Sequence, residues 1–488
     1  MYKALILSLE ELNPYRSLGA HRISSYLREQ QWDIEVLDYA NHFELHELQT
    51  FFNSKYNSDF KFVGVSCNFG TFTKEIDIFC HWIKENYPNV KILIGGQYLP
   101  EVMSQSADYF ITGFGENAMI ELLKYLFSNG KPVKFKIEKG KKVIDGNVFY
   151  PSAPMKSLMV KYEARDFLDP NEWVGIEMGR GCKFECPYCN FPILGVKGDY
   201  TRDAEDYTNQ LQQSFDDYGI HKYIVADETF NETTEKIIKF ADATEKLNFD
   251  PYLTGFIRAD LLVLRKDDRE HLARMGFLGH FYGVESMNQE TAKVIGKGIK
   301  TERLQDGLLE VNQYYQNQNL PFRATLALVV GLPKETVESQ LQTFDWMKKH
   351  WLQDQTTLVW GLEIPTPNST SLKPSKISMD LPKYGYKMMG MENTDKHWMD
   401  FHTLYNDTVA WENEHFTHVT AKEIAGEFWE SIADVNLLTN FALSLCLEHP
   451  KEIIQRKMLN DCEETWETVL EPTRQTNFNR YKNLKLNQ

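Results

Sequence analysis

The first 130 residues alternate short apolar runs with amphipathic stretches. The apolar runs, rich in Ile, Val, Leu and Phe, predict buried strands at residues 3–9, 34–38, 62–67, 91–95 and 109–112. Apolar positions repeat every three or four residues between them, which predicts helices at residues 21–30, 74–86 and 117–128. Strand and helix in this alternation predict a parallel sheet with helices on both faces.

The same alternation resumes after residue 170 with wider spacing. The predicted strands are residues 174–178, 222–226, 252–256, 280–284, 324–330 and 358–364. The predicted helices include residues 206–219, 235–247, 303–315 and 337–350. Six such units predict an open, partial (β/α) barrel, whose polar strand-end residues gather at one mouth.

These patterns divide an α/β chain into four segments. Residues 1–135 fit a flavodoxin-like or Rossmann-like domain, and residues 169–375 form the partial TIM-like barrel. Residues 136–168 are a predicted linker, and residues 376–488 are a predicted helical region. Lysines alternate with Val, Phe and Ile in residues 131–142, which we interpret as the solvated face of a hairpin.

Composition and charge narrow the classes of function. The 488 residues carry 53 Lys and Arg against 69 Asp and Glu, a net charge of −16. This excess of acid disfavours nucleic acid as the partner, because phosphate-backbone sites need clustered Lys and Arg. No apolar run approaches the roughly 18 residues that span a bilayer, and no secretion signal opens the chain. We therefore expect a cytoplasmic protein without a membrane partner.

Three of the seven cysteines lie within eight residues. Cys182, Cys186 and Cys189 have the spacing C-x3-C-x2-C and follow the first barrel strand. Three thiolates at this spacing can bind one metal centre. A structural zinc site takes four protein ligands, and no further cysteine follows until Cys446. A [4Fe–4S] cluster also takes four thiolates as a rule, so three would leave one iron open to a bound ligand.

With Tyr188 before its last cysteine, this motif resembles that of the radical S-adenosylmethionine (SAM) superfamily. In that superfamily the fourth iron holds S-adenosyl-L-methionine (AdoMet), and one electron cleaves it to methionine and a 5′-deoxyadenosyl radical. The resemblance implies a [4Fe–4S] cluster on Cys182, Cys186 and Cys189, AdoMet beside Tyr188, and an electron donor such as flavodoxin or ferredoxin.

Acidic residues at the ends of two predicted barrel strands stand in sequences that are similar to motifs of this superfamily. Asp227 and Glu228 end the second strand, where a carboxylate would receive the AdoMet ammonium group. Asp227 is equally suited to cap a helix. Glu285 and Ser286 end the fourth strand in a sequence similar to the family's GIES element, near ribose and carboxylate.

The remaining resemblances extend the match over residues 170–375. Arg258 follows the third strand and Arg323 opens the fifth; either would pair with the AdoMet carboxylate, and an ordinary surface arginine is the equal alternative. The turn at residues 331–336 resembles GLPGET with Lys334 in the glycine position, and we interpret it as structural. Glu363 opens the segment that takes the place of the sixth strand and its proline turn, where adenine packs.

The first domain resembles the cobalamin (B12)-binding branch of the same superfamily. Small and hydroxyl residues at its strand ends would let a corrinoid approach the backbone. The candidates are Leu18, Gly19, Ser66, Thr71, Gly95, Gly96, Gln97, Gly113 and Glu116. The D-x-H-x-x-G signature of many cobalamin enzymes is missing, and some members of the branch keep the domain without the cofactor.

Three hypotheses of function follow. The favoured one is a cobalamin-dependent C-methyltransferase that acts on an unactivated carbon through a 5′-deoxyadenosyl radical. The second is a radical SAM enzyme with a structural first domain that catalyses cyclisation, rearrangement or oxidation. The third is a non-catalytic metal or corrinoid sensor. A small molecule or a peptide is the expected substrate, and the sequence names no catalytic acid or base.

Overall fold

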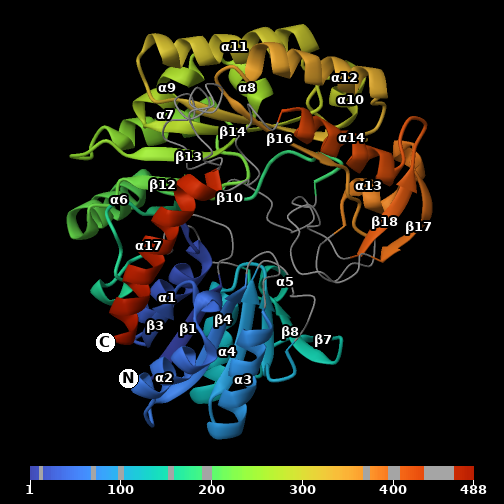
Figure 1. The fold of residues 1–488 in the computed structure, drawn as a ribbon. Helices are drawn as coiled ribbons and strands as arrows, with labels where there is room; N and C mark the ends of the chain where they lie inside the picture. Colours follow the sequence, from blue (N-terminus) through green and yellow to red (C-terminus); the bar gives the residue numbers. More distant parts are fainter. Residues whose placement is uncertain are drawn as a thin grey trace.

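The computed structural model describes residues 1–9, 15–67, 73–96, 104–151, 159–189, 200–366, 374–393, 407–432 and 466–488. Two seven-stranded sheets organise them, and two short two-stranded sheets accompany these. Figure 1 shows the first sheet with its helices in blue and the second in green to orange. Among the predicted site residues, Thr71 and Gln97 lie outside the described residues.

The first sheet has the strand order β3-β1-β4-β5-β6-β8-β7. Its parallel strands are β1 (Lys3–Leu9), β3 (Asp33–Leu37), β4 (Phe60–Cys67), β5 (Lys91–Gly96), β6 (Tyr109–Thr112) and β8 (Lys141–Asp145). The helices are α1 (Leu18–Glu29), α2 (Leu45–Lys55), α3 (Lys74–Asn86) and α4 (Glu116–Phe127). The five predicted strands and the three predicted helices are confirmed within three residues.

Strand β1 shows why these runs are continuously apolar. Leu5 and Leu7 pack into the core under α2 and α3, whereas Ala4 and Ile6 pack into the core under α1 and α4. Both faces of the strand are therefore buried, and the positions from Ala4 to Leu9 are hydrophobic except for Ser8.

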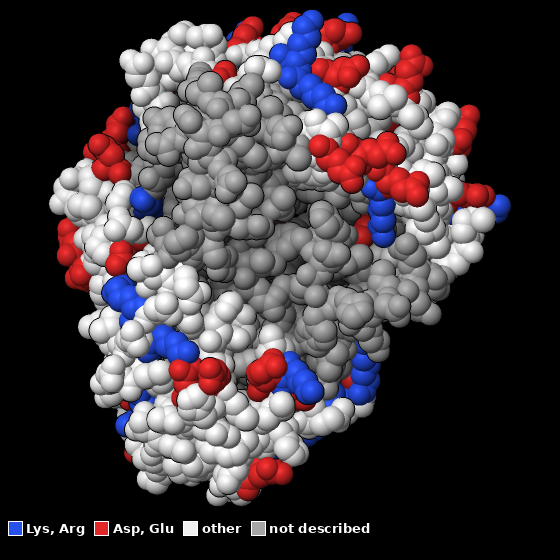
Figure 2. All heavy atoms as spheres, in the orientation of Figure 1, with Lys and Arg blue, Asp and Glu red and all other residues white. Residues whose placement is uncertain are grey.

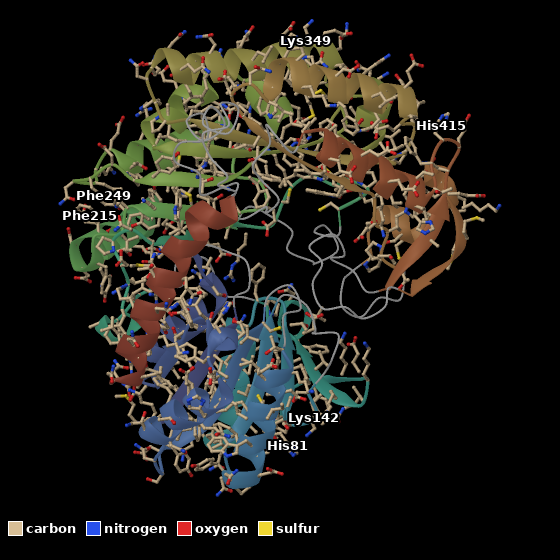
Figure 3. The ribbon with its side chains drawn as sticks, viewed as in Figure 1. His81, Lys142, Phe215, Phe249, Lys349 and His415 are labelled. Atoms are coloured by element: carbon tan, nitrogen blue, oxygen red, sulfur yellow. The ribbon has the colours of Figure 1, made fainter. Side chains whose placement is uncertain are left out.

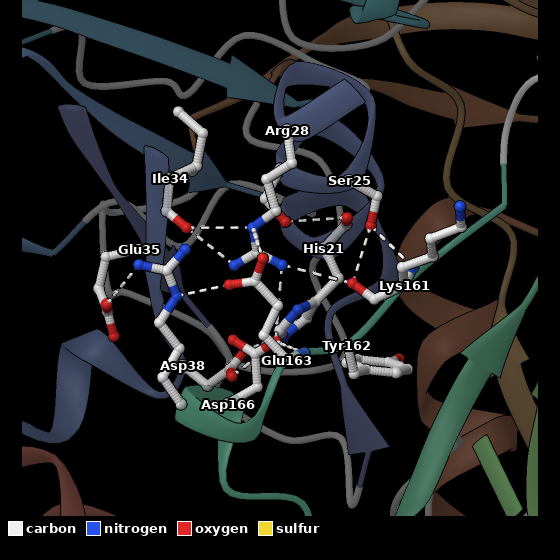
Figure 4. Close-up of polar contacts among 12 residues, drawn as sticks. His21, Ser25, Arg28, Ile34, Glu35, Asp38, Lys161, Tyr162, Glu163 and Asp166 are labelled. Atoms are coloured by element: carbon white, nitrogen blue, oxygen red, sulfur yellow. Dashed lines mark hydrogen bonds and ion pairs between the residues drawn. The ribbon is translucent and has the colours of Figure 1, made fainter. Parts of the chain in front are cut away.

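The predicted linker is partly wrong. Residues 136–145 form the hairpin of β7 (Lys136–Glu138) and β8, and β8 pairs with β6 in parallel, so the hairpin belongs to the first sheet. Its lysine-rich face is solvated, as predicted; Lys142, labelled in Figure 3, lies over the rings of Tyr109 and Phe135. Further along, the backbone nitrogen of Lys161 donates to Ser25 on α1 at 2.9 Å (Figure 4).

The second sheet has the order β16-β15-β14-β13-β12-β9-β2 and is parallel throughout. Its strands are β9 (Trp173–Ile176), β12 (Lys222–Val225), β13 (Tyr252–Ile257), β14 (Phe277–Glu285), β15 (Arg323–Val330) and β16 (Thr356–Gly361). The helices between them include α6 (Ala204–Tyr218), α7 (Thr234–Thr244), α11 (Thr301–Asn317) and α12 (Val337–Trp346). The six predicted barrel units are confirmed.

The first domain contributes the seventh strand of the second sheet. Strand β2 (Tyr15–Arg16) pairs with the start of β9. The side chain of Arg16 is fully buried and forms ion pairs with Asp38 of the first domain and Glu172 beside β9. Asp38 also accepts from His21 at 3.0 Å (Figure 4). Shared strands and buried charges therefore join the two domains.

The prediction of a helical carboxyl-terminal region is partly wrong. Strands β17 (Lys387–Asn393) and β18 (Asp407–Glu412) form an antiparallel pair before helix α14 (His418–Ser431). The last helix, α17 (Trp466–Leu486), returns to the first domain (Figure 1), where Tyr481 accepts a hydrogen bond from the backbone nitrogen of Asp38 at 2.8 Å. Figure 2 shows acidic and basic side chains interspersed around the described rim of this face.

Candidate functional site

The three clustered cysteines lie in a loop at the carboxyl end of β9. Each is half-buried, and the loop passes the ends of the next two strands. Cys182 Sγ is 3.7 Å from Oγ1 of Thr229, which follows β12. Cys186 Sγ is 3.9 Å from Nη1 of Arg258, which follows β13. Burial raises the pKa of the Cys182 thiol. The mouth of the barrel therefore gathers the thiols as the strand order predicts.

Asp227 holds the base of this loop. Its Oδ1 accepts from the backbone nitrogens of Met178 and Gly179 at 2.8 and 2.9 Å, and its Oδ2 lies 2.8 Å from Lys236 Nζ. A Cβ at Gly179 would lie 2.9 Å from Lys236 Nζ, so a larger residue there would displace the lysine from Asp227. Both carboxylate oxygens of Asp227 are thus engaged within the fold, and its assignment to the AdoMet ammonium group stays a prediction.

Glu228 is the carboxylate that the fold leaves available. Its Oε2 is shielded from solvent and has no hydrogen-bond partner among the described residues. Burial raises the pKa of this carboxyl well above its ordinary range, and the charge of Asp227 raises it further. A bound cation would relieve this cost, which fits an ammonium group.

Tyr188 and Glu285 meet across the mouth. The Tyr188 hydroxyl donates to Oε1 of Glu285 at 3.0 Å, and Lys297 Nζ is 3.1 Å from the same oxygen. Glu285 has φ = 67°, in the left-handed region that costs a non-glycine residue free energy. Its tyrosine and lysine partners hold the carboxylate in this strained position beside the cysteine loop.

Ser286 contacts the turn after β15. Its hydroxyl donates to the buried Glu335, and the backbone nitrogen of Asn288 donates to the serine oxygen at 3.0 Å. Lys334, at the family's glycine position, has φ = 69°. The turn is structural, as predicted, and it occupies the Ser286 hydroxyl, which corrects the assignment of Ser286 to AdoMet.

The structure separates the two predicted arginines. Arg258 lies over the ring of Phe184 in the cysteine loop, 3.9 Å from its centroid, and pairs with Asp260. Arg323 begins β15 at the opposite end of the sheet, roughly 23 Å of strand from the mouth. It lies over the ring of Trp173, which begins β9. Arg323 is therefore no AdoMet ligand, and that assignment is corrected.

Glu363 follows β16 at the mouth. Its Oε1 lies 3.6 Å from Nζ of Lys422 on α14. Helix α14 packs on β16 and β15 and thus covers this side of the barrel. Glu363 thus lies at the carboxyl end of the barrel strands, as predicted, and Lys422 is its charged neighbour.

The predicted corrinoid residues fall into two groups. Ser66 pairs in register with Gly95, and Gly95 and Gly96 pair with the end of β6, so these three share the carboxyl edge of the first sheet. Gly113 also lies there, but its φ is 75° and a Cβ would lie 2.8 Å from Asn147. The fold itself therefore requires this glycine.

Leu18, Gly19 and Glu116 serve the contact between the two domains. Leu18 and Gly19 begin α1, and a Cβ at Gly175 of β9 would lie 3.0 Å from the Leu18 side chain. Glu116 is buried, and its Oε1 pairs with Arg22 and Arg180. Because Glu116 is buried and committed to these ion pairs, we correct its assignment to cobalamin; the assignment of Leu18 and Gly19 stays a prediction.

Sequence reasoning missed the buried charges that surround Glu116. Arg180, Glu177 and Arg22 form ion pairs with one another or with Glu116. The available signal was a Glu and an Arg three residues apart, at the end of a strand whose other positions are apolar. Charged side chains at the end of a buried apolar strand are themselves buried only when they form ion pairs.

The residues present fit a cluster with an open ligand position. Three thiols come from one loop, a cation lies beside Cys186, and Glu228 offers an unsatisfied carboxylate oxygen. In the described part of the chain, no three His, Cys, Asp or Glu side chains, these thiols included, are already arranged around a single ion, so the fit rests on the chemistry of the donor set in one loop. Over the same residues, no helix combines the length and apolarity needed to cross a bilayer.

The family model described as the Radical SAM superfamily matches residues 176–347, which contain the cysteine loop and four of the six barrel strands, β12 to β15. The chain contains a radical SAM domain. This domain implies a [4Fe–4S] cluster and AdoMet as cofactors.

Curated relatives are distant. The chain is 24% identical over 257 residues to the anaerobic magnesium-protoporphyrin IX monomethyl ester cyclase of Synechocystis, covering 48% of this chain and 49% of the cyclase. It is 24% identical over 280 residues to an uncharacterized methyltransferase of Pyrococcus horikoshii, covering 54% and 58%. The chain thus spans about half the length of the curated relatives it matches.

Solved radical SAM structures share the fold over the whole chain. The methyltransferase TsrM of Kitasatospora setae, solved with tryptophan substrate and a SAM analogue, aligns with a TM-score of 0.65 and 12% identity, covering 99% of both chains. The cobalamin-dependent enzyme OxsB, with aqua-cobalamin and AdoMet bound, aligns with a TM-score of 0.65 and 14% identity, covering 100% of this chain and 72% of OxsB. The first domain of this chain therefore shares the fold of the corresponding part of these two structures.

Proposed function

We propose that the protein is a radical SAM enzyme that cleaves AdoMet at a [4Fe–4S] cluster held by Cys182, Cys186 and Cys189. Such a cluster, when bound, supplies one electron that splits AdoMet into methionine and a 5′-deoxyadenosyl radical. The observation that carries the proposal is the position of the three cysteines in one loop at the barrel mouth, with the Cys186 thiol beside the Arg258 guanidinium.

The chain's own residues would bind and orient AdoMet. Glu228 would accept its ammonium group, because an ion pair there satisfies the buried Oε2. Tyr188 and Lys297 fix the carboxylate of Glu285 beside the loop. The strands behind the mouth are apolar and buried, which excludes water and competing hydrogen donors from a reactive radical.

The finer proposal is C-methylation of an unactivated carbon with cobalamin on the first domain. The edge formed by Ser66, Gly95 and Gly96 supports it, because two successive glycines beside a serine let a large ring approach the backbone. Cobalamin in OxsB and the methyltransferase activity of TsrM support the same proposal. The substrate would be a small molecule or a peptide, and a flavodoxin or ferredoxin in the cytoplasm would supply electrons.

A second candidate is radical cyclisation, rearrangement or oxidation with a first domain that carries no corrinoid. Specific observations favour it: Gly113, Leu18 and Glu116 all serve packing or ion pairs of the fold. The cyclases among the relatives have that reaction in their names.

Loading with cobalamin separates the two candidates. Hydroxocobalamin is added to the anaerobic protein, the excess is removed by gel filtration, and the absorption spectrum is recorded. Methyl transfer predicts that about one corrinoid per chain stays bound and that Gly95→Leu removes it while AdoMet cleavage continues. Gly426→Leu is the control, because a side chain there meets open space. Failure of the wild type to retain corrinoid contradicts the methyltransferase proposal and leaves the second candidate.

A further inference from the structure

Arg180 lies between the two domains, two residues before Cys182. Its side chain is 4% exposed. The guanidinium forms an ion pair with Glu116 of the first domain through Nη2, and a second with Glu177 of the barrel through Nε. It also lies flat over the ring of Phe114, 3.9 Å from the ring centroid. One side chain of the cysteine loop thus binds two residues of the other domain.

These contacts are costly to disturb. A buried guanidinium needs its carboxylate partners, because removing one partner leaves an uncompensated charge. Burial alone would raise the pKa of Glu116, but the neighbouring Arg180 charge lowers it overall, so the carboxylate stays ionised at neutral pH. The stacked aromatic ring adds a cation–π attraction on the other side of the guanidinium.

The chain on either side of Arg180 transmits its position to the thiols. Gly179 is fixed by Asp227, and Gly181 has φ = 88°, which only glycine adopts without strain. Gly181 alone separates Arg180 from Cys182, and the backbone turns sharply at this glycine. Phe114 and Glu116 follow β6 in a rigid turn, where Asn147 accepts from the backbone nitrogen of Phe114 at 2.9 Å.

We propose that Arg180 is a positioning residue, through which Glu116 and Phe114 of the first domain set the conformation of the cysteine loop and hence AdoMet binding in the barrel. The first domain has this role with or without a corrinoid. The inference rests on the proposed function, because it takes the three cysteines as ligands of the cluster.

The test uses the full chain, reconstituted anaerobically with iron and sulfide and without cobalamin. AdoMet is titrated into the reduced protein, and its dissociation constant is read from the change in the electron paramagnetic resonance spectrum of the cluster. Glu116→Gln removes the charge, and Phe114→Leu removes only the ring. Glu121→Gln, on the same helix, is the control; its side chain is 42% exposed and pairs with Lys124.

The expected result is full iron content in all variants, with AdoMet affinity lowered on the order of tenfold in Glu116→Gln and several-fold in Phe114→Leu, and unchanged in Glu121→Gln. The inference is overturned if Glu116→Gln folds and has the same electron paramagnetic resonance spectrum and the same AdoMet affinity as the wild type. If Glu116→Gln does not fold, Phe114→Leu decides in the same way. A wild type that binds no iron or does not respond to AdoMet instead overturns the proposed function.

Discussion

The guanidinium of Arg258 lies beside the thiol of Cys186, with Nη1 3.9 Å from Sγ. Asp260 and the backbone oxygen of Gly296 hold the guanidinium there, and Phe184 lies beneath it. A positively charged side chain at the end of the third barrel strand thus lies beside the cysteine loop, which follows the first barrel strand. A fixed positive charge next to a cluster ligand favours the reduced state of the cluster.

Arg258→Gln should therefore lower the midpoint potential of the cluster. We expect a shift of about 60 mV, the equivalent of a tenfold change in a one-electron equilibrium. The measurement is a redox titration followed by electron paramagnetic resonance. Arg274→Gln, an arginine that pairs with Glu245 and Asp242 on the outer helices, is the control. Equal potentials in wild type and Arg258→Gln would contradict the assigned role.

Asp227→Asn should destabilise the barrel. Asparagine still accepts from the loop backbone, but it leaves the nearly buried Lys236 without its counter-charge. The expected loss in the free energy of unfolding is about 3 kcal/mol, measured by urea unfolding. The double variant Asp227→Asn, Lys236→Met should recover part of this loss, because the unpaired charge is gone. An unchanged free energy of unfolding in the single variant would show that the ion pair contributes nothing.

The buried carboxyl of Glu335 predicts a pH dependence. Burial raises its pKa from 4.5 to about 8, so the folded state binds more protons than the unfolded state between these values. Stability should fall as pH rises from about 4.5 to 8, with a slope of at most about 1.4 kcal/mol per pH unit, and become independent of Glu335 above that range. Glu335→Gln should remove this slope in melting curves from pH 5 to 9. If wild type and Glu335→Gln lose stability equally as the pH rises, Glu335 is not the cause of the pH dependence.

The last helix should depend on one buried lysine. Lys485 of α17 is fully buried and pairs with Glu35 of β3. Lys485→Met should cost about 3 kcal/mol and increase amide hydrogen exchange along α17. Lys482→Met, which breaks the more exposed pair with Glu47, should cost less than about 1 kcal/mol. If both variants exchange like the wild type, Lys485 does not anchor the helix.

The fold was predictable from the sequence wherever buried residues recur at the regular spacing of a strand or a helix. Strands such as β1, with Leu5 on one face and Ile6 on the other, are apolar on both faces, and amphipathic helices separate them. Residues 387–393 and 407–412 were misread because aromatic and methionine side chains suit a helix and an antiparallel pair equally well. The return of α17 to the first domain rests on Lys485 and Tyr481, whose partners are more than 400 positions away in the sequence.

The site was predictable only in part. The cysteine spacing and the strand-end motif placed Cys186, Tyr188 and Glu228 at one mouth, because parallel strands end at the same edge. Arg323 was correctly expected to open the fifth strand, but the first residue of a parallel strand lies at the edge opposite the mouth, so its assignment to AdoMet did not follow from that position. Spacing also does not show that a charge such as Glu116 has a partner in another domain. Such pairs form only in the folded chain.

The central claim is that three cysteines hold a cluster that cleaves AdoMet. The most direct measurement combines iron and sulfide content with 5′-deoxyadenosine formation, in anaerobic wild type and in Cys182→Ala, Cys186→Ala and Cys189→Ala. The account predicts about four iron and four sulfide per wild-type chain, 5′-deoxyadenosine after reduction, and loss of that product in each variant. Undiminished 5′-deoxyadenosine formation by the variants would contradict it.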